Sequence, residues 1–540
     1  MLAPVVLALA FEGAARLVWP DTELDPYLAL VGRTSALMRR VVDGEEVFVF
    51  SHPQAYGAES GATFAVRKPP GTLRVVAFGG SANAGYPHRP PQRWTDYLQR
   101  ALARACPDKT VEVINLGAHA CASYRVRMIF DDAIDSQPDA VVLYTGNNEF
   151  VERRSYLLDY PGKGLVEGLR AHSVLLTKLS QWWSARSSPG NVLSARERTD
   201  ANAHLWTHTE RIASALRSDP AQYEAVKRHY RYSLEHMVTE CARRGVPVYV
   251  LTVPVNLRDW SPAVSDSPAD EATRTRFEDA YRRGLASLMG GDPGTALVAL
   301  DAALQVDPEH ADALFRRGKA LDALQRYDEA YAAYAAARDN DRNPFRAAQP
   351  FQDIAREVVA ACPGAHLVDA VAAFRVAAAD GLPGFDLMLD YVHPSRAGNL
   401  LLARTVFDAM PEGGGKAGTF TVDDDGYRDE DDEPLQLNLL ALYGIMHQYE
   451  AYLRRADAYE ALLARRGHAL PGPVRNVLEN TRRAFGSYLE ERRKEILGQP
   501  FDAGYRERHA EFYKQFFLYA SELKGALVEP DWGQAPAGGR

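Results

Sequence analysis

Short apolar runs recur along the first 410 residues and are separated by segments with helical periodicity. The runs are LRVVAF (73–78), VEVINLG (111–117), AVVLYTG (140–146), VPVYVLT (246–252) and HLVDA (366–370). Between the first two lies WTDYLQRALARAC, which has a helical pattern. Apolar strands that alternate with helices are typical of parallel sheets covered on both faces. The pattern therefore predicts an α/β fold with a three-layer parallel sheet.

An internal repeat interrupts this pattern between the fourth and fifth runs. Three pairs of small residues are 34 positions apart: Gly284 and Gly318, Ala296 and Ala330, and Ala303 and Ala337. In the second unit Tyr334 takes the place that Leu300 has in the first. The period and the small residues resemble tetratricopeptide repeats. Two repeats are fewer than the three that usually stand alone, so we expect them to lean on a neighbouring domain.

Three further segments have less regular patterns. The run LAPVVLALAF near the N-terminus is too short to span a bilayer, so it is either the end of a membrane anchor or an amphipathic helix packed on the protein. Helical patterns over 153–243 include Trp182 and Trp183 and predict a lid or side wall. Residues 435–527 predict three amphipathic helices, either as a bundle core or with a face for a membrane or a partner.

Glycine-rich and then acidic residues before the last helices predict a solvated linker. The alternative is a calcium loop, but Thr421 and Asp432 stand where such a loop needs Asp and Glu. The chain is thus divided into an N-terminal segment (1–70), a catalytic domain in two parts (71–260 and 346–410), a repeat insert (261–345), a linker (411–434) and a C-terminal helical domain (435–540).

Composition and charge exclude several classes of protein. Of the 540 residues 46% are hydrophobic and 25% charged, as in ordinary globular proteins. The net charge of −9 and the lack of a basic stripe argue against a nucleic-acid partner. The four cysteines show no CxxC spacing, so we expect no metal site, and the chemistry described next needs no cofactor.

Candidate catalytic groups follow the predicted strands. Ser81 lies in FGGSANAG after the first, Ala120 in INLGAHACASY after the second, and Asn148 in TGNNEF after the third. Asp390 and His393 lie in LDYVHPS after the last. Loops at the carboxyl ends of parallel strands face one crevice. A serine, an imidazole, a carboxylate and an amide donor at one edge predict nucleophilic catalysis on an ester or a similar acyl group.

These blocks resemble the SGNH, or GDSL-type, hydrolase superfamily. More narrowly, KPPGTLRVVAFGGS, GNNEFVERR, PVNLRDWSP and LDYVHPS resemble a bacterial branch with an N-terminal membrane anchor and an inserted tetratricopeptide segment. The resemblance covers about residues 1–410. It implies a flavodoxin-like sheet and a membrane-associated protein on the extracytoplasmic (periplasmic) face, while a cytoplasmic location stays open.

The resemblance also implies roles for single residues. Ser81 would be the nucleophile, His393 the base and Asp390 the group that orients the base. The Ser81 amide, the Ala120 amide and the Asn148 side chain would form the oxyanion hole.

Three positions depart from the family pattern. Gly80 replaces the aspartate of Gly-Asp-Ser, and Glu149 replaces the aspartate of Gly-x-Asn-Asp. Ala120 stands where a glycine is expected, with Gly117 three residues earlier. A backbone donor needs no particular side chain, but alanine restricts φ, so the Ala120 assignment is the weakest.

Other residues near the predicted edge are candidates for substrate contacts. Arg258, in NLRDW, and Arg346, in NPFRAAQPF, would clamp an anionic group, and the alternative is a structural salt bridge. Gly117 is a third candidate. His88 and His119 lie near the crevice without an assigned role.

Three functions are compatible with these features. The first is a lipase-like serine esterase or acyl hydrolase that acts on an acyl ester. The second is an O-acyltransferase, such as an acetyltransferase, that uses the same triad on a sugar or natural-product hydroxyl. The third is a scaffold with an inert hydrolase fold that binds a protein partner through the repeats.

We expect residues 275–340 to overhang the crevice, and the alternative is a remote docking arm.

Overall fold

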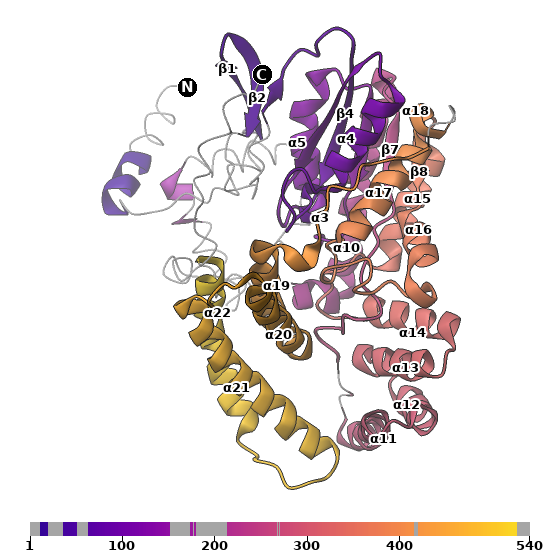
Figure 1. Ribbon diagram of the computed structural model, residues 1–540, viewed down its shortest axis with the longest axis vertical. Helices are drawn as coiled ribbons and strands as arrows, with labels where there is room; N and C mark the ends of the chain where they lie inside the picture. Colours follow the sequence, from indigo (N-terminus) through magenta and orange to yellow (C-terminus); the bar gives the residue numbers. More distant parts are fainter. Residues whose placement is uncertain are drawn as a thin grey trace.

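A five-stranded parallel sheet forms the centre of the molecule (Figure 1). The computed structural model describes residues 11–19, 36–50, 63–151, 173–176, 178–179, 213–266, 268, 270–414 and 419–525. The strands are β4 (Thr72–Gly79), β5 (Thr110–Gly117), β6 (Ala140–Tyr144), β7 (Val248–Leu251) and β8 (Ala365–Val368), in the order β5-β4-β6-β7-β8. All five predicted strands are present, and the predicted α/β class is confirmed.

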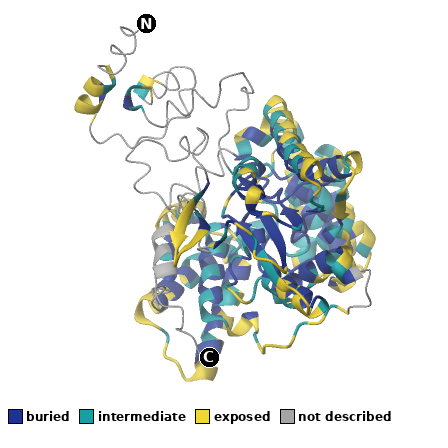
Figure 2. Cartoon of the chain, turned by 90° about the horizontal axis from the view of Figure 1, so that it is seen from above, coloured by how far each residue is buried: buried dark blue, intermediate teal, exposed yellow. Residues whose placement is uncertain are grey.

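Helices cover both faces of this sheet, and its three inner strands β4, β6 and β7 are buried along their whole length (Figure 2). One face carries α5 (Ser123–Ala133), α10 (Pro220–Arg244) and α15 (Gln349–Ala361), and the other carries α4 (Trp94–Ala105), α16 (Ala370–Ala377) and α17 (Arg396–Ala409). Along β4, Val76 and Phe78 join the first core and Val75 and Ala77 the second. This alternation explains why the sequence shows an unbroken apolar run.

The order of the strands places a switch point beside β4. The chain passes from β4 to β5 on one side and reaches β6 on the other, with Gly79 opposite both Gly117 and Tyr144. Crevices that bind ligands form at the carboxyl ends of strands where the order reverses in this way. The topology thus puts a candidate site directly after Gly79.

A small antiparallel sheet precedes β4 and was not expected. It consists of β1 (Leu37–Val42), β2 (Glu45–Phe50) and β3 (Phe64–Ala65), and the Leu37 amide donates to the Asp132 carboxylate at 3.0 Å. Residues 39–42 of β1 are all exposed. Their side chains do not alternate between apolar and polar, which is the pattern that predicts a half-buried strand.

The N-terminal predictions are only partly covered by the structure. Residues 11–18 are helical, while the rest of LAPVVLALAF lies outside the described residues, as do Trp182 and Trp183. Within the described part of the chain, no helix has both the length and the apolar character needed to cross a bilayer. Membrane association stays a prediction.

Two helical hairpins lie between β7 and α15 along the chain. They comprise α11 (Glu271–Met289), α12 (Pro293–Val306), α13 (Ala311–Ala323) and α14 (Tyr327–Asp339). A Cβ atom on Gly284 would lie 2.6 Å from the Leu300 side chain, and one on Gly318 would lie 2.6 Å from the Tyr334 ring. The repeated glycines are therefore the points where the paired helices touch.

The hairpins lean on the loops of the sheet, as expected for so short an array. Leu321 and Tyr334 share an apolar cluster with Val255 and Leu382, and with Val392 next to His393. The insert thus packs against the segment that carries the candidate base. Its expected role as a gate stays a prediction.

Most of the acidic stretch after α17 is exposed, as the sequence predicts, but the stretch is also anchored to the catalytic domain. Residues 419–432 run across the domain, and the carboxylate of Asp425 pairs with the Arg396 guanidinium at 3.1 Å. Asp429 is buried, and accepts hydrogen bonds from His88 Nε2 at 2.8 Å and from the Arg396 amide at 2.7 Å. Local composition gave no sign of these partners, because they lie far away in the sequence.

Two acidic residues of the segment considered as a calcium loop also contact other parts of the protein. Asp423 pairs with Arg104, and Asp432 accepts a hydrogen bond from the Leu435 amide at 3.0 Å, which caps the next helix. The carboxylate of Asp423 therefore binds an arginine and that of Asp432 caps a helix.

Four helices rather than the predicted three follow the acidic stretch: α19 (Glu433–Ile445), α20 (Tyr449–Arg466), α21 (Gly472–Ile496) and α22 (Tyr505–Gly525). One of the breaks lies between α19 and α20, where His447 adopts a left-handed φ of 57°. Glycine or proline usually marks such a break, and neither follows Ile445 in the sequence. Gly444 instead serves packing, because a Cβ there would lie 1.9 Å from the Phe516 ring.

Candidate active site

The turn after β4 has no room for side chains before Ser81. A Cβ on Gly79 would lie 2.1 Å from the Tyr144 carbonyl oxygen, and one on Gly80 would lie 2.2 Å from Asn148 Nδ2. Ser81 then begins the short helix α3 (Ser81–Ala84) and is partly exposed. The two glycines bring the chain close to the end of β6 and leave the serine hydroxyl at the sheet edge.

Ser81, His393 and Asp390 form one chain of hydrogen bonds. His393 Nε2 lies 2.8 Å from Ser81 Oγ, and His393 Nδ1 lies 2.6 Å from Asp390 Oδ2. Asp390 is fully buried and His393 is 3% exposed. An ionised carboxylate only accepts, so Nδ1 carries the proton and the lone pair of Nε2 faces the serine hydroxyl. This arrangement suits a general base for Ser81.

The loop that carries the two residues is fixed by its own backbone. Asp390 Oδ1 accepts from the amides of Val392 and His393, both at 2.8 Å. The Leu389 amide donates to the His393 carbonyl at 2.7 Å. The carboxylate is therefore held by two amides while its other oxygen meets the imidazole.

The C-terminal helix α19 supports the same loop from outside the catalytic domain. The Tyr443 hydroxyl donates to the Leu389 carbonyl, and Arg455 donates to that hydroxyl at 3.3 Å. Burial raises the pKa of Tyr443 to about 12, so the phenol stays a donor. Sequence reasoning missed this support, because Tyr443 is 54 residues from Leu389 and belongs to no motif.

Asn148 lies directly beside the turn of Ser81. Its Nδ2 packs against Gly80 and donates to the Cys121 carbonyl at 3.1 Å. The amide nitrogen carries two protons, and this bond uses one of them. Glu149 is fully buried and accepts from the Ser123 amide at 2.8 Å and from its hydroxyl at 2.9 Å. The loops after β5 and β6 are thus fastened together next to the nucleophile.

Ala120 adopts the conformation that a glycine would favour. Its φ is 51°, in the left-handed region, which costs a non-glycine residue about 1–2 kcal/mol. It is exposed, on the loop that Asn148 contacts through Cys121. The chain therefore keeps the expected backbone despite the alanine, and the amide's role as an oxyanion donor stays a prediction.

The two arginines proposed as substrate contacts make structural contacts, as the alternative interpretation has it, and a contact with substrate stays a prediction. Both nitrogens of the Arg258 fork bind Asp322, at 2.9 and 2.8 Å, and so tie the insert to the domain. Arg346 is buried and donates to the carbonyls of Asn256 and Trp260 at 2.9 and 2.8 Å.

Gly117 is buried at the end of β5. A Cβ there would lie 2.2 Å from the Ala84 amide nitrogen, so the residue serves the close approach of α3 to the sheet.

Aromatic rings that sequence reasoning missed surround the imidazole. The ring of Tyr86 meets His393 edge to face at 5.0 Å and His119 at 4.8 Å between centroids. Tyr391 lies 5.9 Å from His393, and burial together with the charge of Asp390 raises its pKa. The one local hint was the position of Tyr86, five residues after Ser81 in the same turn.

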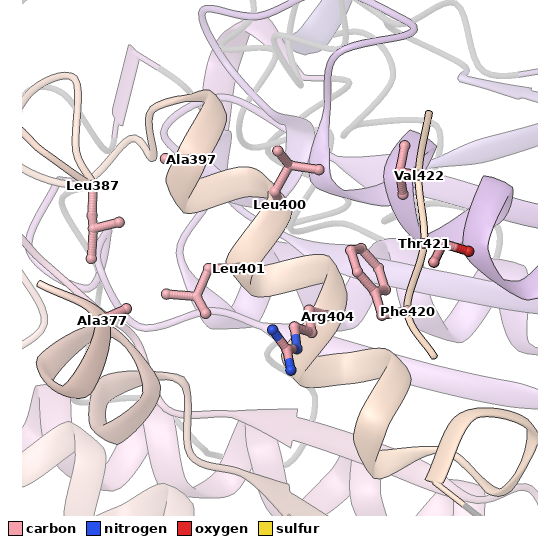
Figure 3. A pocket seen from close by; sticks show the side chains of 9 residues that line it. All are labelled: Ala377, Leu387, Ala397, Leu400, Leu401, Arg404, Phe420, Thr421 and Val422. Atoms are coloured by element: carbon pink, nitrogen blue, oxygen red, sulfur yellow. The ribbon is translucent and has the colours of Figure 1, made fainter. Parts of the chain in front are cut away.

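A hollow of about 500 Å³ opens elsewhere, between α16, α17 and residues 420–422 (Figure 3). Its lining is mostly aliphatic, with Leu400, Leu401 and Phe420 on its walls and Arg404 beside them. Ser81, Asp390 and His393 are not among the lining residues.

Replacing Asn148 by alanine should lower kcat by about 10²–10³-fold with little change in KM, if its amide stabilises charge that develops on the oxyanion. Steady-state kinetics with a small activated ester measures both constants.

Gly80→Ala should lower kcat in the same way, because its methyl group displaces Asn148 Nδ2.

The exposed residue Asn476 on α21 offers a matched control, and Asn476→Ala should behave like the wild type. An effect of Asn148→Ala confined to KM would mean that the side chain binds substrate and is no oxyanion donor.

Comparison with known proteins adds one family match. A tetratricopeptide repeat model matches residues 287–350, which confirms the predicted repeats over that range. No curated protein matches the chain.

Solved structures similar to this chain are described as hydrolases. One is LAE5, an alpha/beta hydrolase from the metagenome of Lake Arreo, Spain (11% identity, TM-score 0.27, covering 62% of this chain and 94% of that one). Another is the lipase/acylhydrolase from Enterococcus faecalis (14% identity, TM-score 0.26, covering 62% of this chain and 93% of that one). A third is the acetylxylan esterase Axe2 from Geobacillus stearothermophilus (13% identity, TM-score 0.25, covering 62% of this chain and 93% of that one). At these TM-scores the likeness supports no conclusion about the function of this chain.

Proposed function

We propose that this protein is a serine hydrolase of the SGNH type that cleaves carboxylic esters through an acyl-enzyme on Ser81. The proposal rests above all on the continuous chain of hydrogen bonds from Asp390 through His393 to Ser81. Such a chain turns a weakly nucleophilic hydroxyl into a nucleophile.

In the first half of the reaction the alcohol leaves. His393 Nε2 takes the hydroxyl proton while Ser81 Oγ attacks the acyl carbon, and Asp390 stabilises the imidazolium. The carbonyl oxygen becomes an oxyanion, and the Asn148 amide with the backbone amides of Ser81 and Ala120 are the proposed donors to it. His393 then gives its proton to the alcohol oxygen, the ester C–O bond breaks, and the acyl group remains on Ser81.

In the second half water repeats these steps. His393 takes a proton from water, the resulting hydroxide attacks the acyl-enzyme, and Ser81 recovers its proton as the carboxylic acid leaves. An alcohol in place of water would complete an acyl transfer with the same groups.

A fluorophosphonate probe tests the proposal, since it reacts covalently with activated serines. We expect one adduct, located on Ser81 by peptide mass spectrometry, and its loss in Ser81→Ala. A folded wild-type chain that takes up no probe would contradict the proposal and favour the inert scaffold.

A further inference from the structure

The position of His393 decides where the alcohol part of an ester must lie. In the proposed reaction the imidazole that takes the Ser81 proton must later protonate the alcohol oxygen, so that oxygen approaches Nε2. In the same proposed reaction the acyl oxygen lies toward the side chain of Asn148, which is beside Gly80. Side chains next to the imidazole are therefore the ones that meet the alcohol.

Two partly exposed side chains, from segments far apart in the sequence, meet beside the imidazole. Tyr86 lies edge to face with His393, and its hydroxyl donates to Asn438 Oδ1 on α19 at 3.4 Å (Figure 1 shows α19 near α3). The two residues are 352 positions apart. Asn438 therefore brings the C-terminal helices to the catalytic edge.

We propose that Tyr86 and Asn438 form the binding site for the alcohol part of the substrate, and that this alcohol carries further hydroxyl groups, as a polyol or a sugar does. The proposal rests on the proposed function, because it takes the orientation of the substrate from His393.

The polarity of the pair is the reason for this class of alcohol. The Tyr86–Asn438 bond is at the long end of hydrogen-bond distances, so it gives little to the folded state and is easily exchanged. A substrate hydroxyl can donate to Asn438 Oδ1 and accept from the Tyr86 hydroxyl at the same time. An aliphatic alcohol would instead displace water from the Tyr86 hydroxyl and from Asn438 Oδ1 without forming a hydrogen bond to either group.

The amide of Asn438 is held in place for such a contact. Its Nδ2 donates to the Pro434 carbonyl one helical turn earlier, at 3.1 Å, so the oxygen is the end that faces Tyr86. The helix itself is fixed to the catalytic loop through Tyr443 and the Leu389 carbonyl. Binding groups on a rigid element discriminate best between similar substrates.

Glyceryl monoacetate and propyl acetate test the proposal, since they share the acyl group and a three-carbon alcohol and differ in two hydroxyl groups. We expect the wild type to have the higher kcat/KM for glyceryl monoacetate. Tyr86→Phe and Asn438→Ala should each lower the ratio of the two kcat/KM values by about tenfold, the equivalent of one lost hydrogen bond. The double variant should lose little more, because both side chains bind one hydroxyl.

Asn476→Ala, the same exchange at an exposed site of α21, should keep the wild-type ratio. Equal losses on both esters would mean that Tyr86 and Asn438 only support the fold, and would overturn the binding site. A wild type that prefers propyl acetate would overturn the class of alcohol. Failure of the proposed function looks different, because 4-nitrophenyl acetate would then not be hydrolysed in a way that depends on Ser81.

Discussion

Replacing Ser81 by alanine is expected to lower kcat for 4-nitrophenyl acetate by on the order of 10⁶-fold, the loss seen when a serine hydrolase is deprived of its nucleophile. The reason is geometric, since Ser81 Oγ is the hydroxyl that lies 2.8 Å from the imidazole that would activate it. The fold should be unaffected, because a partly exposed hydroxyl is removed and no larger group is added. Single-turnover kinetics and circular dichroism measure the two effects.

Ser487→Ala is the matched control, because Ser487 is exposed on α21. It should keep full activity. A Ser81→Ala protein that still turns over the ester at the wild-type rate would show that another group performs the chemistry.

The Asp390→Asn variant is expected to lose about 10⁴-fold in kcat while its structure stays intact. Asp390 Oδ1 accepts two backbone amides, so the amide oxygen of the variant should stay there and its NH₂ group should face His393 Nδ1. The imidazole would then have to accept at Nδ1 and carry its proton on Nε2. In that tautomer it has no lone pair to take the Ser81 proton.

Asp108→Asn, at an exposed position before β5, controls for the loss of a negative charge and should be fully active. The nitrogen shifts of His393 in NMR spectra report the tautomer directly. Wild-type kcat in Asp390→Asn would show that the orientation of the imidazole does not depend on this carboxylate.

The sheet and the placement of the candidate residues were predictable because both depend on short stretches of sequence. The inner strands β4, β6 and β7 are buried on both faces, so each appears as an apolar run, and parallel strands bring their carboxyl ends to one edge. Ser81, Asn148 and His393 follow such runs, and the structure brings them together. Their catalytic roles stay predictions.

What the sequence did not reveal depends on contacts between distant segments. Asp429 lies in an acidic stretch that is typical of a solvated linker, yet it is buried against His88, 341 residues away. Tyr443 and Asn438 belong to α19, a helix outside the family resemblance, so only the folded chain shows that they reach the catalytic loop and Tyr86. A local sequence pattern shows that a residue is polar, but it does not show which distant residue will bury it and bind it.

The central claim is that the acyl group of the substrate is carried on Ser81. Mixing the protein with 4-nitrophenyl acetate, quenching in acid within the first turnover and measuring the mass of the intact chain and its peptides tests this directly. We predict a gain of one acetyl group, located on Ser81 and absent from Ser81→Ala. Release of nitrophenolate with no acetyl group on Ser81, or with the acetyl group on another residue, would contradict it.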